Sequence, residues 1–437
     1  MAIHAPLSIE VLPLSRRPEP KYKLLVSTST FVRQVDDLQP RFVLDLVKSL
    51  QSHFSIVVLA PSYPGACDME TIDGVKVIRF RYAPFRSLET LAYNGGIMAQ
   101  LVRRPLKALL LPFFFWGQRR ALSRLCSDQH FDAINAHWSI PQALIACTLQ
   151  NNQRIPLITT CHGGDVYLFH KSPFKALLAF CLRRSNKVVA VSEELRELCA
   201  QLIGDSTKEK DLVRVPMGVH LVSYDSPKWT PASASAQESG DFVVTFVGRL
   251  VAKKGVATLI DAIHRLPKRL SSNRKVVLQI IGDGILRKSL ENRAAALGLG
   301  ERVHFIGWRS QDQLPELLRT SDICVVPSLL ARDGDKDGLP VTLLEAAASG
   351  TPVIGSDVAG IPDYLIHEKN GLLCPPGDAN ALAKQLHRLM TDEELRQKLT
   401  AQGLEDVRAF DWRDIGMLYA AIINDAIAKR KARNDRG

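Results

Sequence analysis

Short apolar runs alternate with longer stretches of helical periodicity along most of the chain. In the first half, the apolar runs predict buried strands at residues 23–27, 56–60, 75–79, 133–136, 157–160 and 188–191. Amphipathic helices are predicted between several of them, at residues 42–50, 142–150, 174–182 and 193–202. Parallel strands need long crossover connections, which helices supply, so this alternation predicts a parallel sheet covered by helices.

The same alternation restarts after residues 223–240, a stretch rich in Ser, Ala and Pro that we interpret as an interdomain linker. Further strands are predicted at residues 243–247, 276–281, 303–306, 323–326 and 353–354, and helices at 256–265, 286–297, 314–321, 339–349 and 379–389. We therefore expect two Rossmann-like, doubly wound α/β domains, at residues 1–222 and 241–412. In such sheets ligands bind beyond the carboxyl ends of the strands.

The end of the chain carries one more apolar stripe with helical spacing, from Ile415 to Ile427, followed by a basic tail that we expect to be frayed. With 437 residues, the chain is long enough for two domains that each bury a core.

Composition excludes several classes of protein. The 8 cysteines are scattered without a Cys-x-x-Cys pair, which argues against a disulfide framework or a zinc site and favours a reducing cytoplasm. Residues 1–20 contain four prolines and no apolar core, so we expect no signal peptide, and no run approaches the roughly 18 apolar residues of a membrane span. The net charge of +11 comes without a nucleic-acid recognition motif, so no nucleic-acid partner is expected.

The stretch at residues 333–355 has the pattern of an anion site. A polar loop leads to Pro340, a residue tolerated at a helix start, and Gly350 and Pro352 limit the helix to a short one. The free amides of Val341, Thr342 and Leu343 at its start suit an anion. Two acids flank them, because Asp337 precedes the helix and Glu345 lies in its second turn. Phosphates on the amides and sugar hydroxyls on the acids would match a nucleotide sugar.

Two other interpretations of this stretch stay open. Asp337 can simply favour the helix dipole while Glu345 is a solvated helix residue. A calcium loop is a weaker alternative: Asp333, Asp335, Asp337 and Gly338 fit the EF-hand pattern, but its twelfth position falls on Leu344 and Pro340 interrupts the loop.

The acid, seven intervening residues and Glu in Asp337-Gly-Leu-Pro-Val-Thr-Leu-Leu-Glu345 resemble the donor-site motif of family 4 retaining glycosyltransferases. The family's first acid is usually Glu, so Asp337 is one methylene shorter. The resemblance implies the GT-B fold, in which two Rossmann-like domains face a central cleft. It also implies an acceptor domain first, a donor domain second, and a last helix, here residues 413–430, that crosses back onto the first domain.

Donor contacts are carried over from the resemblance. A glycine-bounded turn at residues 248–255 matches the family's diphosphate site, so Gly248, Arg249 and Lys254 are assigned to the donor, and Arg and Lys suit a diphosphate chemically. The alternative is a solvated basic turn. Further donor contacts are expected at Gly282, Ile306, Gly338, Leu339, Val341 and Thr342. A dinucleotide fingerprint at Gly282 is not favoured, because its third glycine would fall on Arg287. Trp308 is either a base contact or a packing residue.

On the acceptor side, a glycine-bearing loop after the strand at residues 157–160 holds His162 and Asp165. By resemblance His162 is a catalytic-site residue that hydrogen-bonds the transferred sugar. The preceding strand ends at an equivalent place, where His137 and Trp138 are expected to line the acceptor cleft together with Asp165.

The resemblance thus implies a retaining, metal-independent hexosyltransferase-like enzyme of polysaccharide biosynthesis. His162, Arg249, Lys254, Asp337 and Glu345 would be catalytic, a nucleoside diphosphate sugar would be the donor, and a hydroxyl of a glycan or lipid-linked glycan the acceptor. No cofactor and no metal are expected. The alternatives are a phosphorylase, a sugar-nucleotide epimerase or a non-catalytic binding subunit.

Residues 103–124 combine a short apolar run, the four successive aromatics Phe113 to Trp116, and flanking arginines. This is the composition of an interfacial segment that contacts anionic lipid. The alternative is a core helix of the first domain with its charges in solvent. The first interpretation predicts a cytoplasmic protein held peripherally at the inner face of the membrane.

Overall fold

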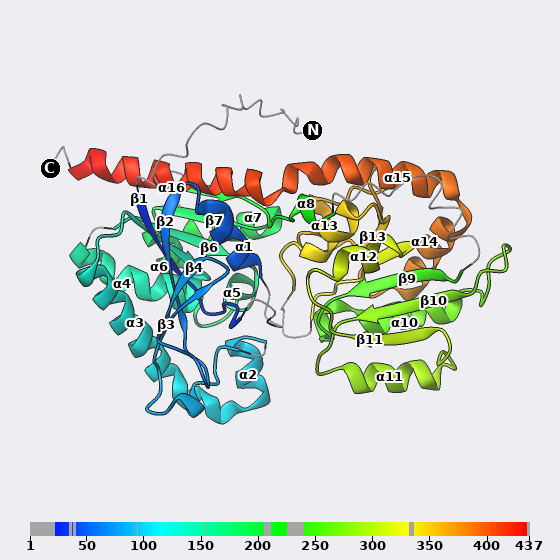
Figure 1. Ribbon diagram of the computed structural model, residues 1–437, viewed down its shortest axis with the longest axis horizontal. Coiled ribbons are helices and arrows are strands. Elements are labelled where there is room, and N and C mark those ends of the chain that lie inside the picture. The colour runs from blue at the N-terminus through cyan, green and yellow to red at the C-terminus, as the bar shows by residue number, and fades with distance from the viewer. Residues whose placement is uncertain are drawn as a thin grey trace.

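The computed structural model of the chain describes residues 22–34, 37, 41–93, 95–153, 155–204, 211–224, 240–331 and 336–434. Two lobes, each built on a sheet with helices on its faces, lie side by side, and the last helices of the chain run one after the other along the second lobe and then the first (Figure 1). This confirms the α/β fold class with two mainly parallel sheets. The linker predicted at residues 223–240 lies almost entirely outside the described residues.

The first lobe contains an 8-stranded sheet in the order β3-β4-β2-β1-β5-β6-β7-β8. Its strands are β1 (Tyr22–Ser27), β2 (Phe54–Pro61), β3 (Met69–Ile72), β4 (Val75–Phe80), β5 (Ala133–His137), β6 (Leu157–Cys161), β7 (Lys187–Ala190) and β8 (Leu212–Arg214). The central strands are apolar because both faces of a parallel sheet are covered. All pairs are parallel except β3 with β4, which are joined by Asp73 and Gly74, both with positive φ.

Helices of the first lobe connect these strands. They are α1 (Phe42–Leu50), α2 (Ile97–Arg103), α3 (Leu111–Asp128), α4 (Leu144–Gln153), α5 (Gly164–Tyr167), α6 (Lys175–Arg184), α7 (Glu193–Ile203) and α8 (Leu221–Tyr224). The helix predicted at residues 142–150 begins only at Leu144. A wider turn at Ser139–Ala143 precedes it, because Trp138 and Ile140 have non-helical backbone angles.

The second lobe contains a 6-stranded, fully parallel sheet in the order β11-β10-β9-β12-β13-β14. Its strands are β9 (Phe242–Val247), β10 (Val276–Ile281), β11 (Val303–Gly307), β12 (Ile323–Val326), β13 (Val353–Ser356) and β14 (Leu372–Cys374). Its helices are α10 (Val256–Arg265), α11 (Arg287–Ala296), α12 (Leu314–Arg319), α13 (Val341–Ala348), α14 (Ala379–Thr391) and α15 (Glu393–Asp406).

Strand order reverses near the middle of each sheet, between β9 and β12 in the second lobe and between β1 and β5 in the first. In open α/β sheets, the crevice beyond the carboxyl ends of the strands at such a point is where ligands bind. The loops after β5, β6, β9 and β12 carry most of the chemistry-bearing residues singled out from the sequence.

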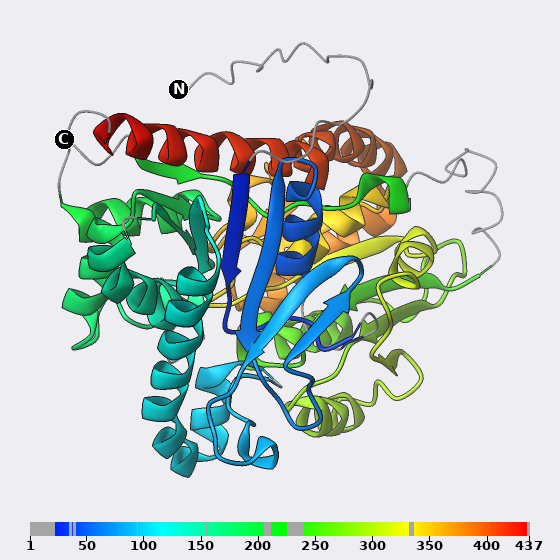
Figure 2. The ribbon, with the colours of Figure 1, turned by 60° about the vertical axis from the view of Figure 1, so that its left-hand side comes forward.

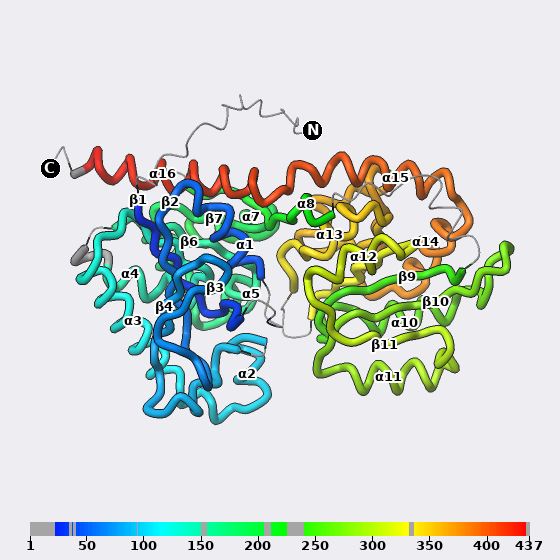
Figure 3. The backbone as a smooth tube through the Cα atoms, in the orientation of Figure 1, coloured from blue at the N-terminus to red at the C-terminus, as the bar shows by residue number. Residues whose placement is uncertain are grey.

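The last helix, α16 (Trp412–Asn434), follows α15 from the second lobe and runs back along the first (Figure 3). Its apolar stripe is buried in the core of the first lobe together with residues of α1; Ile415, Tyr419 and Ile423 are at most 1% exposed. Gly416 allows the close approach, since a β-carbon there would lie 2.6 Å from Oγ of Ser49. The helix therefore ties the end of the chain to the first lobe.

Candidate active site

Two glycine-bearing loops bring the lobes into contact beside the predicted site. A β-carbon added to Gly338 would lie 2.6 Å from Cγ2 of Val191 and 3.1 Å from the carbonyl oxygen of His162, both in the first lobe. A β-carbon on Gly163 would lie 3.5 Å from the amide nitrogen of Gly338. The backbone after β6 therefore lies directly against the backbone that precedes α13. Residues 162 and 338, which are far apart in the sequence, meet across the two lobes.

Asp337 is the centre of a charge cluster in the second lobe. Its carboxylate pairs with Nζ of Lys254 at 2.8 Å and of Lys253 at 3.5 Å, and Ser328 donates a hydrogen bond to it at 3.2 Å. Burial alone would raise the pKa of Asp337, but the two lysines outweigh burial and lower the pKa to about 2. The carboxylate is thus ionised and shares its charge with two lysines of the turn after β9.

The same turn begins with Gly248 and the exposed Arg249. Arg249 reaches toward the first lobe, since a β-carbon on Gly95 would lie 3.7 Å from its Nη1. Gly282 lies behind the turn, where a β-carbon would be 2.0 Å from the carbonyl oxygen of Gly248. Gly282 is therefore required for the packing of two neighbouring loops, whatever it contributes to a ligand.

Helix α13 begins at Val341, two residues after the predicted start at residue 339, and the backbone of Pro340 before it is still extended. Leu339, just before it, is buried, and Val341 packs against the core of the first lobe. The hydroxyl of Thr342 donates to the carbonyl oxygen of Val247 at 3.4 Å, at the end of β9. The first turn of α13 therefore lies at the switch point of the sheet, between the lobes.

Glu345, one turn further, is 5% exposed, which contradicts the alternative of a solvated helix residue. The side-chain amide of Gln311 donates a short hydrogen bond to its carboxylate. Burial raises the pKa of Glu345 to about 6, against the lowering effect of Gln311 and with a smaller raising effect of Asp45 from the first lobe. Gln311 was not predicted as a site residue; the signal for it in the sequence is its place shortly after β11, at the carboxyl edge of the sheet.

The expected base contacts lie at the end of β11. Ile306 is half-buried, and Trp308 is 40% exposed, so Trp308 is not a core packing residue. The amide of Gly282 donates to the carbonyl oxygen of Gly307 at 2.9 Å, which joins this strand end to the turn after β10.

In the first lobe, His162 lies against three rings. Its ring is 4.9 Å from Phe42, 4.8 Å from Trp138 and 5.1 Å from His137, measured between centroids, and nearly parallel to the last. Nε2 of His162 is 2.8 Å from Nδ1 of His137. Burial lowers the pKa of His137 to about 3, and burial together with His137 lowers the pKa of His162 well below its usual value. Both imidazoles are therefore neutral.

Two expectations for the acceptor side are wrong in their geometry. His137 is fully buried and cannot line a cleft, because β5 extends to include it and β6 covers it. Asp165 is 4% exposed, and its carboxylate accepts hydrogen bonds from the amide and hydroxyl of Ser139 and from the amides of His162 and Gly163. Asp165 therefore joins the loops after β5 and β6. Trp138 is half-buried with a φ of 76°, and its acceptor role stays a prediction.

Metal ligands do not gather in the described part of the chain, where no group of three or more His, Cys, Asp or Glu side chains suits a metal ion. Asp333 and Asp335 of the calcium-loop alternative lie outside the described residues. Within the described ranges, no helix is both long and apolar enough to cross a membrane.

Comparisons with known proteins agree with this geometry. The family model "Glycosyltransferase Family 4" matches residues 39–222, and "Glycosyl transferases group 1" matches residues 228–406. The chain is 30% identical to the phosphatidyl-myo-inositol mannosyltransferase of Mycobacterium leprae over 358 residues, which cover 80% of this chain and 90% of the relative.

Two solved structures show the same fold at lower identity. Sucrose-phosphate synthase from Thermosynechococcus elongatus superimposes with a TM-score of 0.73 at 21% identity, over 93% of this chain and 100% of the other. Anabaena HepE in complex with UDP-glucose gives a TM-score of 0.65 at 19% identity, over 94% and 100%. The two lobes, the switch-point site and the family matches together show that the chain belongs to the family 4 glycosyltransferases and has the GT-B fold.

Proposed function

We propose that this glycosyltransferase moves a sugar from a nucleoside diphosphate sugar to a hydroxyl of a glycan or glycolipid acceptor, with retention at the anomeric carbon. The observation that carries the proposal is the convergence of Arg249, Lys254, the first turn of α13 and buried Glu345 at the switch point of the second sheet, next to His162 of the first lobe. The division into an acceptor domain at residues 1–222, completed by the last helix, and a donor domain at residues 241–412 is part of this proposal.

The donor's diphosphate suits the cationic turn after β9. Arg249 supplies a planar guanidinium for two phosphate oxygens, and Lys254 supplies a point charge. The amides of Val341 and Thr342 add donors at the positive end of a helix dipole. These groups would stabilise the charge that develops on the leaving diphosphate, which is an electrostatic contribution to catalysis that requires no metal.

Asp337 holds Lys254 and Lys253 in place through its ion pairs. Glu345 offers a buried carboxylate that can accept hydrogen bonds from ribose hydroxyls. His162 offers a neutral ring nitrogen to a hydroxyl of the transferred sugar. With the diphosphate held on one face of the sugar, its oxygen can take the acceptor's proton while the acceptor attacks from that face, and the configuration is retained.

Known relatives support parts of this assignment. HepE was solved with UDP-glucose, and the mycobacterial relative is a mannosyltransferase of a phosphatidyl-inositol. For the present chain, a nucleotide sugar as donor and a cell-surface glycan or glycolipid as acceptor are our proposals. A phosphorylase, an epimerase or a non-catalytic subunit remain the competing functions.

A panel of nucleotide sugars tests the donor. A ligand that binds only the native state raises the melting temperature, so one or a few nucleotide sugars should stabilise the protein. Glu345→Ala should weaken the binding of that donor, since a hydrogen bond to a charged group contributes about 1.5 to 3 kcal/mol. Glu301→Ala, at an exposed acid of the same lobe, is the matched control.

Product analysis tests the reaction. The donor that stabilises the protein should be consumed only with a hydroxyl acceptor present, and the new linkage should keep the donor's anomeric configuration. Sugar phosphate formed from inorganic phosphate would indicate a phosphorylase, and a free epimerised sugar would indicate an epimerase. Donor binding without any turnover across acceptors would favour the non-catalytic subunit.

We further propose that one end of the first lobe contacts an anionic membrane at the cytoplasmic face. Large apolar side chains are exposed there from the turn after β4, from α2 and from the segment leading into α3: Phe85, Leu88, Met98, Val102, Leu106, Leu109, Phe113 and Trp116. We call these eight residues the apolar end surface. The elements that carry it gather at the lower end of the first lobe in Figures 1 and 2.

Neither sequence interpretation of residues 103–124 is complete. Phe114 is fully buried against Phe80 and Tyr82, as the core-helix alternative expects. Phe113 and Trp116 are 54% and 60% exposed on the opposite face of α3, as the interfacial interpretation expects. One face of α3 is thus buried in the core, and another face is exposed to solvent.

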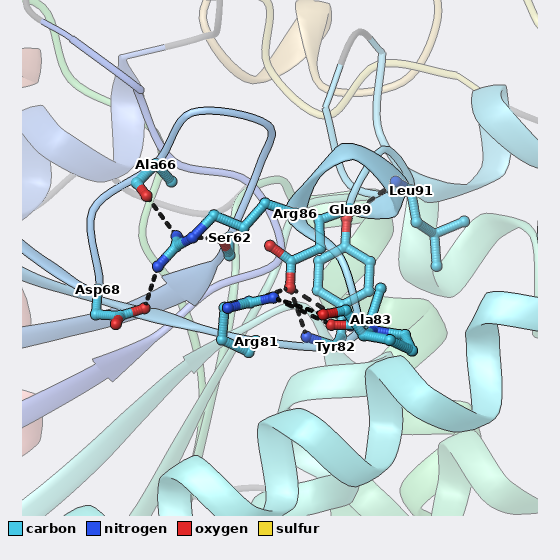
Figure 4. A network of polar contacts seen from close by, with 10 residues as sticks. Ser62, Ala66, Asp68, Arg81, Tyr82, Ala83, Arg86, Glu89 and Leu91 are labelled. Carbon is cyan, nitrogen blue, oxygen red and sulfur yellow. Dashed lines mark hydrogen bonds and ion pairs between the residues drawn. The ribbon is translucent and has the colours of Figure 1, made fainter.

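A buried network holds the turn that carries Phe85 and Leu88 (Figure 4). Glu89 is fully buried and accepts hydrogen bonds from Arg81 at 2.8 Å and from the amide of Tyr82 at 3.0 Å, while Arg86 pairs with Asp68 at 2.6 Å. These contacts restrain the turn that presents Phe85 and Leu88. Five exposed arginines lie on the same elements: Arg103, Arg104, Arg119, Arg120 and Arg124. This combination of apolar and cationic groups suits anionic lipid.

A further inference from the structure

The hydrogen bond between the two histidines continues into the first sheet. Asn135 and His137 lie two residues apart on β5, so their side chains share one face of the strand. Nδ2 of Asn135 is 3.4 Å from Nε2 of His137, and the hydroxyl of Thr160 on β6 donates to Oδ1 of Asn135 at 3.1 Å. The chain of contacts therefore runs from Thr160 through Asn135 and His137 to His162.

The direction of this chain follows from the chemistry of each group. The oxygen of the Asn135 amide is bound by Thr160, so its nitrogen faces His137, and an amide nitrogen can only donate. Nε2 of His137 must then be the acceptor, and the single proton of this neutral imidazole lies on Nδ1. Nδ1 donates to Nε2 of His162. The proton of neutral His162 must therefore lie on its own Nδ1.

We propose that His137 is a positioning residue that, with Asn135 and Thr160 behind it, fixes His162 in the Nδ1-protonated tautomer, so that His162 acts as a hydrogen-bond donor to a sugar hydroxyl. The contacts of His162 with Phe42 and Trp138 restrain the plane of the ring as well. The role of His162 toward the sugar rests on the proposed function, whereas its tautomer does not.

The tautomer is directly measurable in the full-length protein without any substrate. In protein labelled with ¹⁵N-histidine at neutral pH, nitrogen shifts and long-range proton couplings distinguish the two neutral tautomers and the cation. The chain has 11 histidines, so the signals are assigned by their loss in His137→Gln and His162→Gln. We expect both residues to be neutral and protonated on Nδ1. A cationic His162, or one protonated on Nε2, would overturn the proposal.

Variants at position 137 test the consequence for turnover. Nδ2 of an asparagine occupies nearly the place of Nδ1 of histidine, so His137→Asn keeps a donor toward His162, while His137→Leu removes it. We expect His137→Leu to lower kcat about tenfold, the effect of one lost hydrogen bond, with donor affinity nearly unchanged. His137→Asn should restore most of kcat. Equal losses in the two variants, or a loss in donor affinity alone, would refute a positioning role.

Thr159→Val is the matched control. Thr159 precedes Thr160 on β6 and forms a buried hydrogen bond with Ser185 at 2.6 Å, apart from the histidine chain. This variant should leave the histidine tautomers and kcat unchanged even if it destabilises the protein. If the wild-type protein shows the expected tautomers but binds no nucleotide sugar, the proposed function fails and the tautomer assignment stands.

Discussion

The buried carboxylate of Glu345 should reduce the stability of the protein at neutral pH. Its pKa is raised by burial from 4.5 to about 6, so ionising it costs more free energy in the folded protein than in the unfolded chain. That difference in pKa corresponds to about 2 kcal/mol. Glu345→Gln keeps the shape of the side chain and an oxygen that can accept from Gln311, but it removes the charge. We therefore expect the variant to be more stable than the wild type at pH 7.5.

The sign of the pH dependence is fixed by the direction of the shift. Between pH 4.5 and about 6 the folded protein binds more protons at Glu345 than the unfolded chain does, so the free energy of unfolding falls as pH rises through this window. Above about pH 6 the full cost is present, and below pH 4.5 it vanishes. The gain in Glu345→Gln should therefore approach 2 kcal/mol at pH 7.5 and be small at pH 4.5.

Urea-induced unfolding at both pH values measures this, with Glu301→Gln as an exposed control that should show no such difference. Glu345→Gln should weaken nucleotide-sugar binding although it raises stability, because in our proposal the carboxylate binds the ligand but destabilises the folded protein. A gain of equal size at both pH values, or a loss of stability at pH 7.5, would refute the assignment of the cost to a buried charge.

Three further predictions follow from the charge cluster and the surface. Turnover should persist in excess chelator, because Arg249, Lys254 and helix amides supply the positive charge; complete loss that magnesium or manganese restores would contradict this. Lys254→Ala should weaken the binding of a nucleoside diphosphate far more than the binding of the corresponding nucleoside. Calorimetry measures both affinities, and equal effects on the two would exclude a phosphate contact. The protein should sediment with anionic liposomes at low salt and less so at high salt, and Phe113→Ser with Trp116→Ser should reduce sedimentation while Phe180→Ser, at an exposed site on α6, should not. A protein that stays in the supernatant at low salt would rule out the membrane contact.

The class of fold and most of the helices and strands could be predicted from the sequence. Helices α1 and α10 and strands β10 and β12 have the bounds that periodicity predicts. The two helices pack on a sheet and the two strands lie inside one, so the spacing of their apolar residues shows directly which side of each element is buried. Strands β3, β8 and β14 were missed because they have only 3 or 4 residues, too few to show a periodic pattern. The Asp73-Gly74 pair was an available turn signal for β3.

The interactions of the side chains in the site could not be predicted from the sequence. His137 follows an apolar run and looks like a loop residue in the sequence, yet it is buried because β5 extends to include it, β6 pairs alongside it, and the loop after β6 contributes His162 as its partner, 25 residues away. Gln311 reaches Glu345 across 34 residues. Periodicity reports which face of an element is covered, but it carries no information on which distant residue covers it. The partners that set the charge and hydrogen-bonding state of these groups are therefore fixed only when the strands and lobes assemble.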